Sequence, residues 1–301
     1  MAVEKALNVG PAGIDVAYER FGEAHNPPVL LVMGVAAQMI NWPDGFCAEL
    51  ADRGMHVIRF DNRDAGLSTH LSDAPPPDLP AALAGDLSSA AYTLSDMAAD
   101  AVGLLDALGL DSAHFVGASM GGMIAQTVAI EHPDRIRSLT SMMSTTGAPS
   151  VGQASPEALA VLGGPPAVTR EEVIERAVRM LRVVGSPGFP MEEAELRERT
   201  GRAYDRSYDP AGTARQAVAA VASGDRTARL GQVTTPTLVI HGADDAMCDV
   251  SGGHATAAAI PGAELVVIDG MGHNLPRDLW PDIAAHIAAL VHRAEAARVG
   301  A

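Results

Sequence analysis

A serine at position 119 has the surroundings expected of an enzyme nucleophile. Residues 117–121 read Gly-Ala-Ser-Met-Gly, which matches the G-x-S-x-G pattern of a nucleophile elbow. The motif lies between a short apolar run, expected to be a strand, and a helical pattern at 120–132. Such a turn exposes the hydroxyl at a helix N-terminus, where backbone N–H groups favour negative charge. We therefore prefer a nucleophile to the simpler interpretation, a serine that caps a helix.

A serine nucleophile needs a base, and histidine is suited to that role near neutral pH. Among ten histidines, His273 lies in the segment 270–274, Gly-Met-Gly-His-Asn, directly after the last expected strand. Loops at the carboxyl ends of strands carry the chemistry of open α/β sheets. His241 belongs to a strand end, and His114 and His132 flank the serine motif, so structural roles explain them more simply. The pattern favours His273 as the base.

A carboxylate must orient that histidine and stabilise its protonated form. Asp244 and Asp245 follow the next-to-last expected strand, and either fits the chain order Ser, acid, His. Neighbouring loop residues point in different directions, so only one of the two should face the histidine. Asp61, which follows an earlier strand, is a weaker alternative.

Acyl transfer also needs two N–H donors for the oxyanion of the tetrahedral intermediate. The residue after the nucleophile supplies one, which is the backbone N–H of Met120. The loop after the apolar run at 28–34 should supply the other, and this indicates Val35. We expect the substrate pocket beside this oxyanion hole to include Gly34, Trp42 and Met123.

Around these residues, short apolar runs alternate with longer amphipathic ones, which favours a mainly parallel sheet covered by helices. We expect an edge strand at 13–21 and a loop at 73–92. The other expected strands are 28–34, 56–60, 114–117, 136–143, 237–241 and 264–268, and the expected helices are 44–53, 94–108, 120–132 and 281–296.

The alternation stops between about residues 145 and 230. Helical patterns occur there at 170–183 and 211–222, with a glycine- and proline-rich loop at 185–190 and no convincing strand. We interpret this stretch as a helical cap inserted into one core. The expected division is core at 1–144, cap at 145–230 and core at 231–301.

Composition restricts the partners and the location. Apolar residues make up 48% of the 301, enough for a large core, and the net charge of −16 disfavours nucleic acid. Two cysteines do not suggest a disulfide scaffold. The first residues lack the apolar region of a secretory signal, and no stretch is apolar enough to span a bilayer. We expect a cytoplasmic protein without a membrane partner, either a monomer or a homodimer.

The chain resembles an α/β-hydrolase over nearly its whole length, and it is similar to bacterial esterases of the aclacinomycin methylesterase type. The resemblance rests on residues 30–34, 41–43, 56–61, 236–240 and 270–273. It implies that Asp245, the last residue of a G-x-x-D turn, is the acid, and that Val35 is the second oxyanion donor. Two positions depart from the common pattern: Met33 replaces the histidine of His-Gly, and Ala246 replaces a proline after the acid.

The leading hypothesis is hydrolysis of a small-molecule carboxylic ester through an acyl-enzyme, without a metal or an organic cofactor. The resemblance to a methylesterase favours a methyl ester of a bulky apolar acid. Enol-lactone hydrolysis, C–C bond hydrolysis and perhydrolysis use the same triad and stay open. Serine at the elbow argues against dehalogenases and epoxide hydrolases, which need a carboxylate nucleophile. A non-catalytic small-molecule binding protein or receptor is the alternative of another class.

Overall fold

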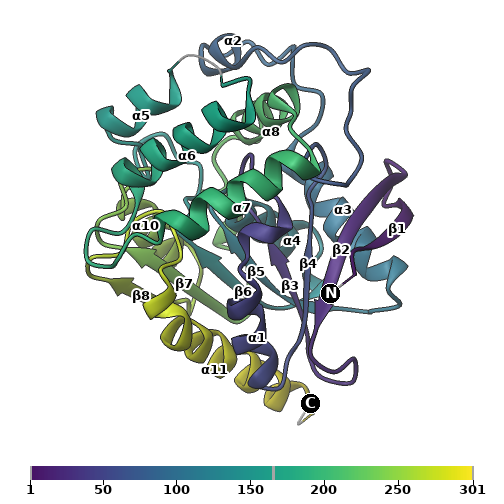
Figure 1. The fold of residues 1–301 in the computed structure, drawn as a ribbon. Coiled ribbons are helices and arrows are strands. Elements are labelled where there is room, and N and C mark those ends of the chain that lie inside the picture. The colour runs from purple at the N-terminus through teal and green to yellow at the C-terminus, as the bar shows by residue number, and fades with distance from the viewer. Residues whose placement is uncertain (1, 165–166, 300–301) are drawn as a thin grey trace.

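The protein is built on one eight-stranded sheet, seen in a computed structural model that describes residues 2–164 and 167–299 (Figure 1). The strand order is β1-β2-β4-β3-β5-β6-β7-β8. β1 and β2 are antiparallel to their neighbours, and the pairs from β4 to β8 are all parallel. The strands are β1 (Glu4–Val9), β2 (Ile14–Phe21), β3 (Pro28–Val32), β4 (His56–Phe60), β5 (Ala113–Ala118), β6 (Ile136–Met142), β7 (Thr237–Gly242) and β8 (Glu264–Ile268).

Helices cover both faces of the sheet, because the inner strands are apolar on both sides. Within β3, Leu30 packs into one buried cluster and Leu31 into the other, as expected when successive side chains alternate. The first cluster joins the sheet to α3 (Leu94–Ala107) and α4 (Met120–Glu131). The second joins it to α1 (Asp44–Asp52) and α11 (Trp280–Val299). α10 (Ser251–Ala259) connects β7 to β8.

Between β6 and β7 the chain forms helices only, as far as its described residues extend. These are α5 (Pro156–Leu162), α6 (Arg170–Val184), α7 (Glu193–Arg206), α8 (Pro210–Ala222) and α9 (Thr227–Leu230). Figure 1 shows α5 to α8 gathered at one end of the sheet, and α8 packs against the short α2 (Leu79–Leu83). This helical insertion lies where the alternation of strands and helices stops in the sequence.

The expected fold class is confirmed, and two local expectations were wrong. The segment 13–21 was expected at the sheet edge, but β2 lies between β1 and β4, and β1 is the edge strand. The segment 73–92 was expected to be a loop, but it contains α2. Both cysteines are free and buried. Among the described residues, no helix has the length and apolarity needed to cross a membrane.

Candidate active site

Ser119 lies at the turn between β5 and α4, in a backbone conformation that few residues other than glycine adopt. Its φ is 56° and its ψ is −124°. Two hydrogen bonds between Ser119 and the end of β6 stabilise this turn. The Ser119 N–H donates to Met142 O at 2.9 Å, and Ser144 Oγ, just after β6, donates to Ser119 O at 2.8 Å. A strained residue held by its surroundings is typical of functional sites.

The two glycines of the motif are required by close backbone approach rather than by their own φ angles. A Cβ at Gly117 would overlap the carbonyl oxygen of Gly121, and a Cβ at Gly121 would overlap the carbonyl oxygen of Val32 in β3. The turn can therefore be this tight only with glycine at both positions. This packing explains in physical terms why glycines flank the serine in the pattern G-x-S-x-G.

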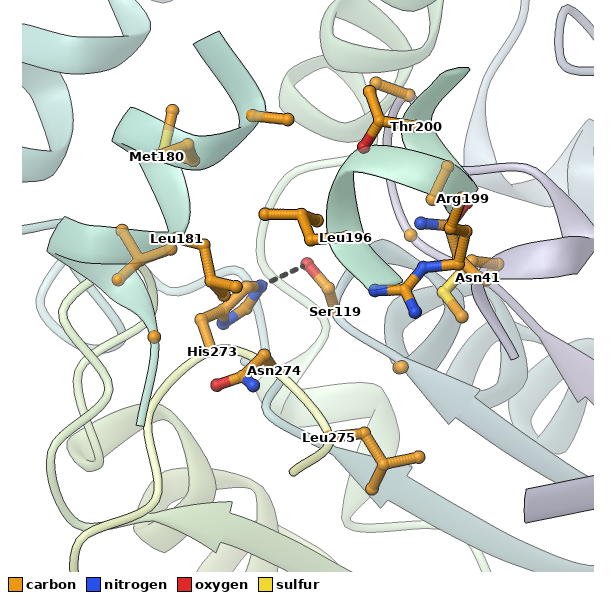
Figure 2. Close-up of a pocket in the computed structure, with 18 of the residues that line it drawn as sticks. Asn41, Ser119, Met180, Leu181, Leu196, Arg199, Thr200, His273, Asn274 and Leu275 are labelled. Atoms are coloured by element: carbon orange, nitrogen blue, oxygen red, sulfur yellow. Dashed lines mark hydrogen bonds between the residues drawn. The ribbon is translucent and has the colours of Figure 1, made fainter. Parts of the chain in front are cut away.

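Three side chains form a continuous hydrogen-bonded chain at the carboxyl ends of β5, β7 and β8. His273 Nε2 lies 3.0 Å from Ser119 Oγ, and His273 Nδ1 lies 2.7 Å from Asp245 Oδ2 (Figure 2 shows the serine–histidine bond). Asp245 is only 5% exposed. Its other oxygen accepts hydrogen bonds from the backbone N–H groups of Met247 and Cys248 at 2.9 and 2.8 Å. The three residues predicted as a triad are thus brought together.

The two neighbouring aspartates have different partners. Asp244 Oδ2 accepts a hydrogen bond from the Gly270 N–H at 2.8 Å, so it braces the histidine loop instead of contacting the imidazole. Asp61 accepts from the backbone N–H groups of Met39 and Leu67 and pairs with Arg206. Burial raises the pKa of Asp61 despite these partners. Asp245 is the carboxylate that faces His273.

Two of the alternative histidines, His241 and His114, have structural partners, and His132 is the residue that ends α4. His241 is fully buried, and its Nε2 lies 2.7 Å from Cys248 O and 3.6 Å from Asp245 Oδ2. Burial lowers the pKa of His241, which favours the neutral form. His114 is bonded to Ser138 Oγ, and its burial lowers its pKa to about 4.

The backbone N–H groups of Val35 and Met120 have no acceptor among the described residues. Their neighbour Gly34 lies against the serine, since a Cβ there would come within 2.9 Å of Ser119 Cβ. Ala36 has a φ of 63°, and its N–H donates to Gln216 Oε1 of α8 at 3.0 Å. A side chain of the helical insertion therefore holds the loop that carries Val35.

Further bonds connect the insertion to the two loops of the site. Gln38 Nε2 donates to the carbonyl oxygens of Ala203 and Ser207, at 2.7 and 2.9 Å. The His273 N–H donates to the carbonyl oxygen of Val184 at the end of α6, at 2.6 Å. The insertion thus contacts both the oxyanion loop and the histidine loop.

A cavity of about 960 Å³ opens above Ser119 and is bounded by core loops and by α6 and α7. Gly34 and Trp42, two of the three residues expected in the substrate pocket, line this cavity. Met123 is not one of its lining residues and instead packs, partly buried, against the cluster around α3 and α4. Met123 lies one turn into α4, where its side chain belongs to the core side of the helix, so its place near the serine in sequence does not bring it into the cavity.

One further cluster has the residue types of a metal site: Asp64, His70 and Asp209. Arg215 already occupies its centre, with Nη2 at 2.8 Å from Asp64 Oδ1 and 3.3 Å from Asp209 Oδ2. The guanidinium supplies the positive charge that a cation would bring. We interpret this cluster as a junction between α8 and the core.

Two functional candidates were missed by the sequence reasoning, Gln216 in α8 and Arg199 in α7. Each is an ordinary polar residue inside a helical pattern, without a motif around it. The sequence could have indicated these two residues only as polar positions on the side of a cap helix that faces the end of the sheet. The contact of Gln216 with Ala36 spans 180 residues of sequence.

A half-buried serine on a strand-to-helix turn, bonded to a histidine that is bonded to a buried carboxylate, defines the class of serine hydrolases. A model of the family described as alpha/beta hydrolase fold matches residues 27–276. The chain belongs to that family.

Three known proteins show where the chain lies within the family. It is 32% identical to rhodomycin D methylesterase DnrP of Streptomyces peucetius over 299 residues, which covers 90% of this chain and 93% of that protein. It is 34% identical to a 2-hydroxy-6-oxononadienedioate/2-hydroxy-6-oxononatrienedioate hydrolase of Dechloromonas aromatica, over 57% of this chain and 59% of that protein. A thermophilic esterase of Thermogutta terrifontis, of known structure, is 26% identical with a TM-score of 0.72, over 98% of this chain and 99% of that one.

Proposed function

We propose that the protein hydrolyses carboxylic esters through an acyl-enzyme on Ser119. The observation that carries the proposal is the chain of hydrogen bonds from Ser119 through His273 to Asp245 at the floor of a large cavity. Similarity to a methylesterase over nine-tenths of the chain supports the same reaction.

The geometry supports a definite role for each group. His273 Nε2 is placed to take the proton as Ser119 Oγ attacks the ester carbonyl, and then to give it to the departing alcohol. Asp245 fixes the tautomer with the proton on Nδ1 and stabilises the imidazolium that forms. Water then attacks the acyl-enzyme with His273 again as base, which releases the acid and restores the serine.

The backbone N–H groups of Val35 and Met120 are our candidates for the oxyanion hole. Both are free of other acceptors within the described chain; Met120 follows Ser119 in sequence, and Val35 follows Gly34, which lies against the serine. Hydrogen bonds to the oxyanion are worth about 2.7 to 4 kcal/mol each in the transition state. Because backbone groups do this work, neither side chain needs a particular identity.

The helical insertion, residues 145–230 in the proposed division, would act as a cap that selects the acyl group. A cavity of about 960 Å³ is far larger than an acetyl group needs, and α6 and α7 supply much of its wall. Together with the methylesterase relative, this favours methyl esters of bulky acids as substrates. Higher kcat/KM for such esters than for acetates with the same alcohol would support this choice.

Hydrolysis of a carbon–carbon bond is the second candidate, favoured by the 34% identity to the Dechloromonas aromatica hydrolase over part of the chain. The same serine and histidine would serve a ketone in place of an ester. An assay with a vinylogous diketone beside a methyl ester of matched size separates the two, since the better substrate has the higher kcat/KM.

The direct test is Ser119→Ala measured on a methyl ester of a large acid. We expect kcat to fall by about 10⁴- to 10⁶-fold, with the fold unchanged by circular dichroism. Ser150→Ala, in an exposed loop, is the matched control and should behave as the parent. Activity of the Ser119→Ala variant within tenfold of the parent would rule out the proposed nucleophile.

A further inference from the structure

A positive charge projects into the cavity from its cap side. Arg199 lies on α7 and is one of the lining residues. Figure 2 shows its side chain extending into the cavity on the far side of Ser119 from His273. The cap also contributes apolar side chains to the cavity wall, including Met180, Leu181 and Leu196. A guanidinium in such a wall is costly unless something compensates its charge.

Within the described chain, Arg199 has no hydrogen-bond or ion-pair partner. Its Nε is buried and unbonded, and burial lowers its pKa. The other two arginines of the cavity lining are paired: Arg182 with Glu193 at 3.0 Å, and Arg277 with Glu195. Among the described residues, Arg199 is therefore the lining arginine without an acidic partner at hydrogen-bond distance.

Among the described residues, no acid of the cavity lining makes a hydrogen bond or an ion pair with Arg199, although the charge of Glu195 partly offsets the effect of burial on its pKa. Glu195, one turn before Arg199 on α7, is bound by Arg277. Asp64 is bound by Arg215, and Asp209 is bound by His70 at 2.7 Å and by Arg215. A partner for the Arg199 guanidinium must come from what enters the cavity.

We propose that Arg199 binds an anionic oxygen on the acyl portion of the substrate, either a carboxylate or an ionised phenol or enol. Guanidinium presents N–H donors in a planar fork that suits such oxygens, and bonds of this kind are among the strongest in proteins. The inference rests on the proposed ester hydrolysis and names the substrate class for that same site.

The position of Arg199 assigns the anion to the acyl side. The alcohol oxygen must face His273 Nε2, since it takes its proton there as the ester bond breaks. Arg199 lies across Ser119 from that nitrogen (Figure 2), so we assign the acyl chain to the Arg199 side of the serine. The substrate class is then a monoester of a bulky acid that carries a second, ionised acidic group.

The kinetic test compares two pairs of methyl esters that differ only in one charge. The first pair is the monomethyl and the dimethyl ester of a long dicarboxylic acid. The second is a methyl naphthoate with a free phenol and its methyl ether, above the pKa of the phenol. We expect the parent to prefer at least one anionic member, and Arg199→Met to lower kcat/KM for that member by about 10- to 100-fold. Its neutral partner should change less than threefold.

Controls separate the site from general charge effects. Arg202→Met removes an exposed cation from the same helix outside the cavity lining, and should leave the preference intact. Arg199→Lys keeps the charge but not the fork, and should retain part of the preference. An ester with the carboxylate on its alcohol side should be insensitive to Arg199→Met. If neither anionic ester gains over its neutral partner in the parent, the inference is wrong and ester hydrolysis still stands.

Binding provides a readout that does not depend on turnover. In a Ser119→Ala background, Trp42 and Trp280 of the cavity lining report ligand binding by their fluorescence. The monomethyl ester should bind about tenfold or more tightly than the dimethyl ester, and adding Arg199→Met should abolish that difference. Equal binding of the two esters to Ser119→Ala would overturn the inference, even if the reaction proves to be another.

Discussion

The core and the cap contribute to the site in different ways. The core supplies Ser119, Asp245 and His273 from three turns at strand ends, where backbone packing leaves little freedom. The cap supplies cavity walls and single side chains, such as Arg199 and Gln216, from helices without distinctive motifs. The candidate catalytic residues can therefore be recognised from short local sequence motifs, whereas the residues that choose the substrate depend on how helices distant in sequence pack together.

The strongest test of the core's part is the pair of neighbouring aspartates. Asp245→Asn should lower kcat by about 10⁴-fold, because the amide cannot stabilise the imidazolium and favours the wrong tautomer. Asp244→Asn is the matched control, and should cost less than tenfold because Asp244 only braces Gly270. Steady-state kinetics on one methyl ester measures both. Equal losses, or the reverse order, would show that the acid has been assigned to the wrong residue.

The sequence alone predicted the three residues that the structure brings together as a candidate triad, because each follows a strand in a short loop with recognisable glycines. It did not reveal β1, whose pairing with β2 shifts register between Ala6 and Val9, so the alternation of buried residues is broken. It also missed α10, whose nine residues are mostly small and show no amphipathic pattern. The prediction for Met123 was wrong because its side chain packs against the cluster around α3 and α4 and does not line the cavity, although the residue is close to Ser119 in sequence.

Gln216→Leu tests whether the cap also supports the chemistry. The side chain is fully buried, accepts from the Ala36 N–H and donates to Arg63 O at 2.8 Å. Losing it should loosen the loop that carries Val35 and lower kcat by about tenfold, less than the 10²- to 10³-fold of a lost oxyanion donor.

KM for the same ester should change little in Gln216→Leu, because the hydrogen bond acts on the oxyanion loop and not on the cavity wall. Gln232→Leu, at an exposed position after α9, is the control. A rise in KM with unchanged kcat would mean that Gln216 only shapes the cavity.

Acidification should lower the stability that neutral His114 contributes in the core, whereas it should preserve the contribution of His70 at the contact between core and cap. Burial lowers the pKa of His114 to about 4, so between pH 6.5 and 4 the unfolded chain binds a proton that the folded chain does not. Folding stability should fall across that window by on the order of 1 to 3 kcal/mol. Burial opposes charge on His70 too, but hydrogen bonds to a backbone carbonyl and to Asp209 raise its pKa, so its contribution is kept as pH falls and lost as pH rises.

Urea unfolding of the parent and of His114→Gln at several pH values measures this smallest effect. The variant should show a shallower loss of stability between pH 6.5 and 4, whereas His286→Gln, on the exposed side of α11, should follow the parent. Identical slopes in all three proteins would show that His114 does not stay neutral in the core.

The central claim is that Ser119 is an activated nucleophile, and covalent labelling tests it most directly. A fluorophosphonate probe should phosphonylate the pure parent protein, and peptide mass spectrometry should place the added mass on Ser119. Ser119→Ala should remain unlabelled, and Asp245→Asn should react much more slowly. A folded parent protein that takes up no label, or that carries it on another residue, would contradict the account.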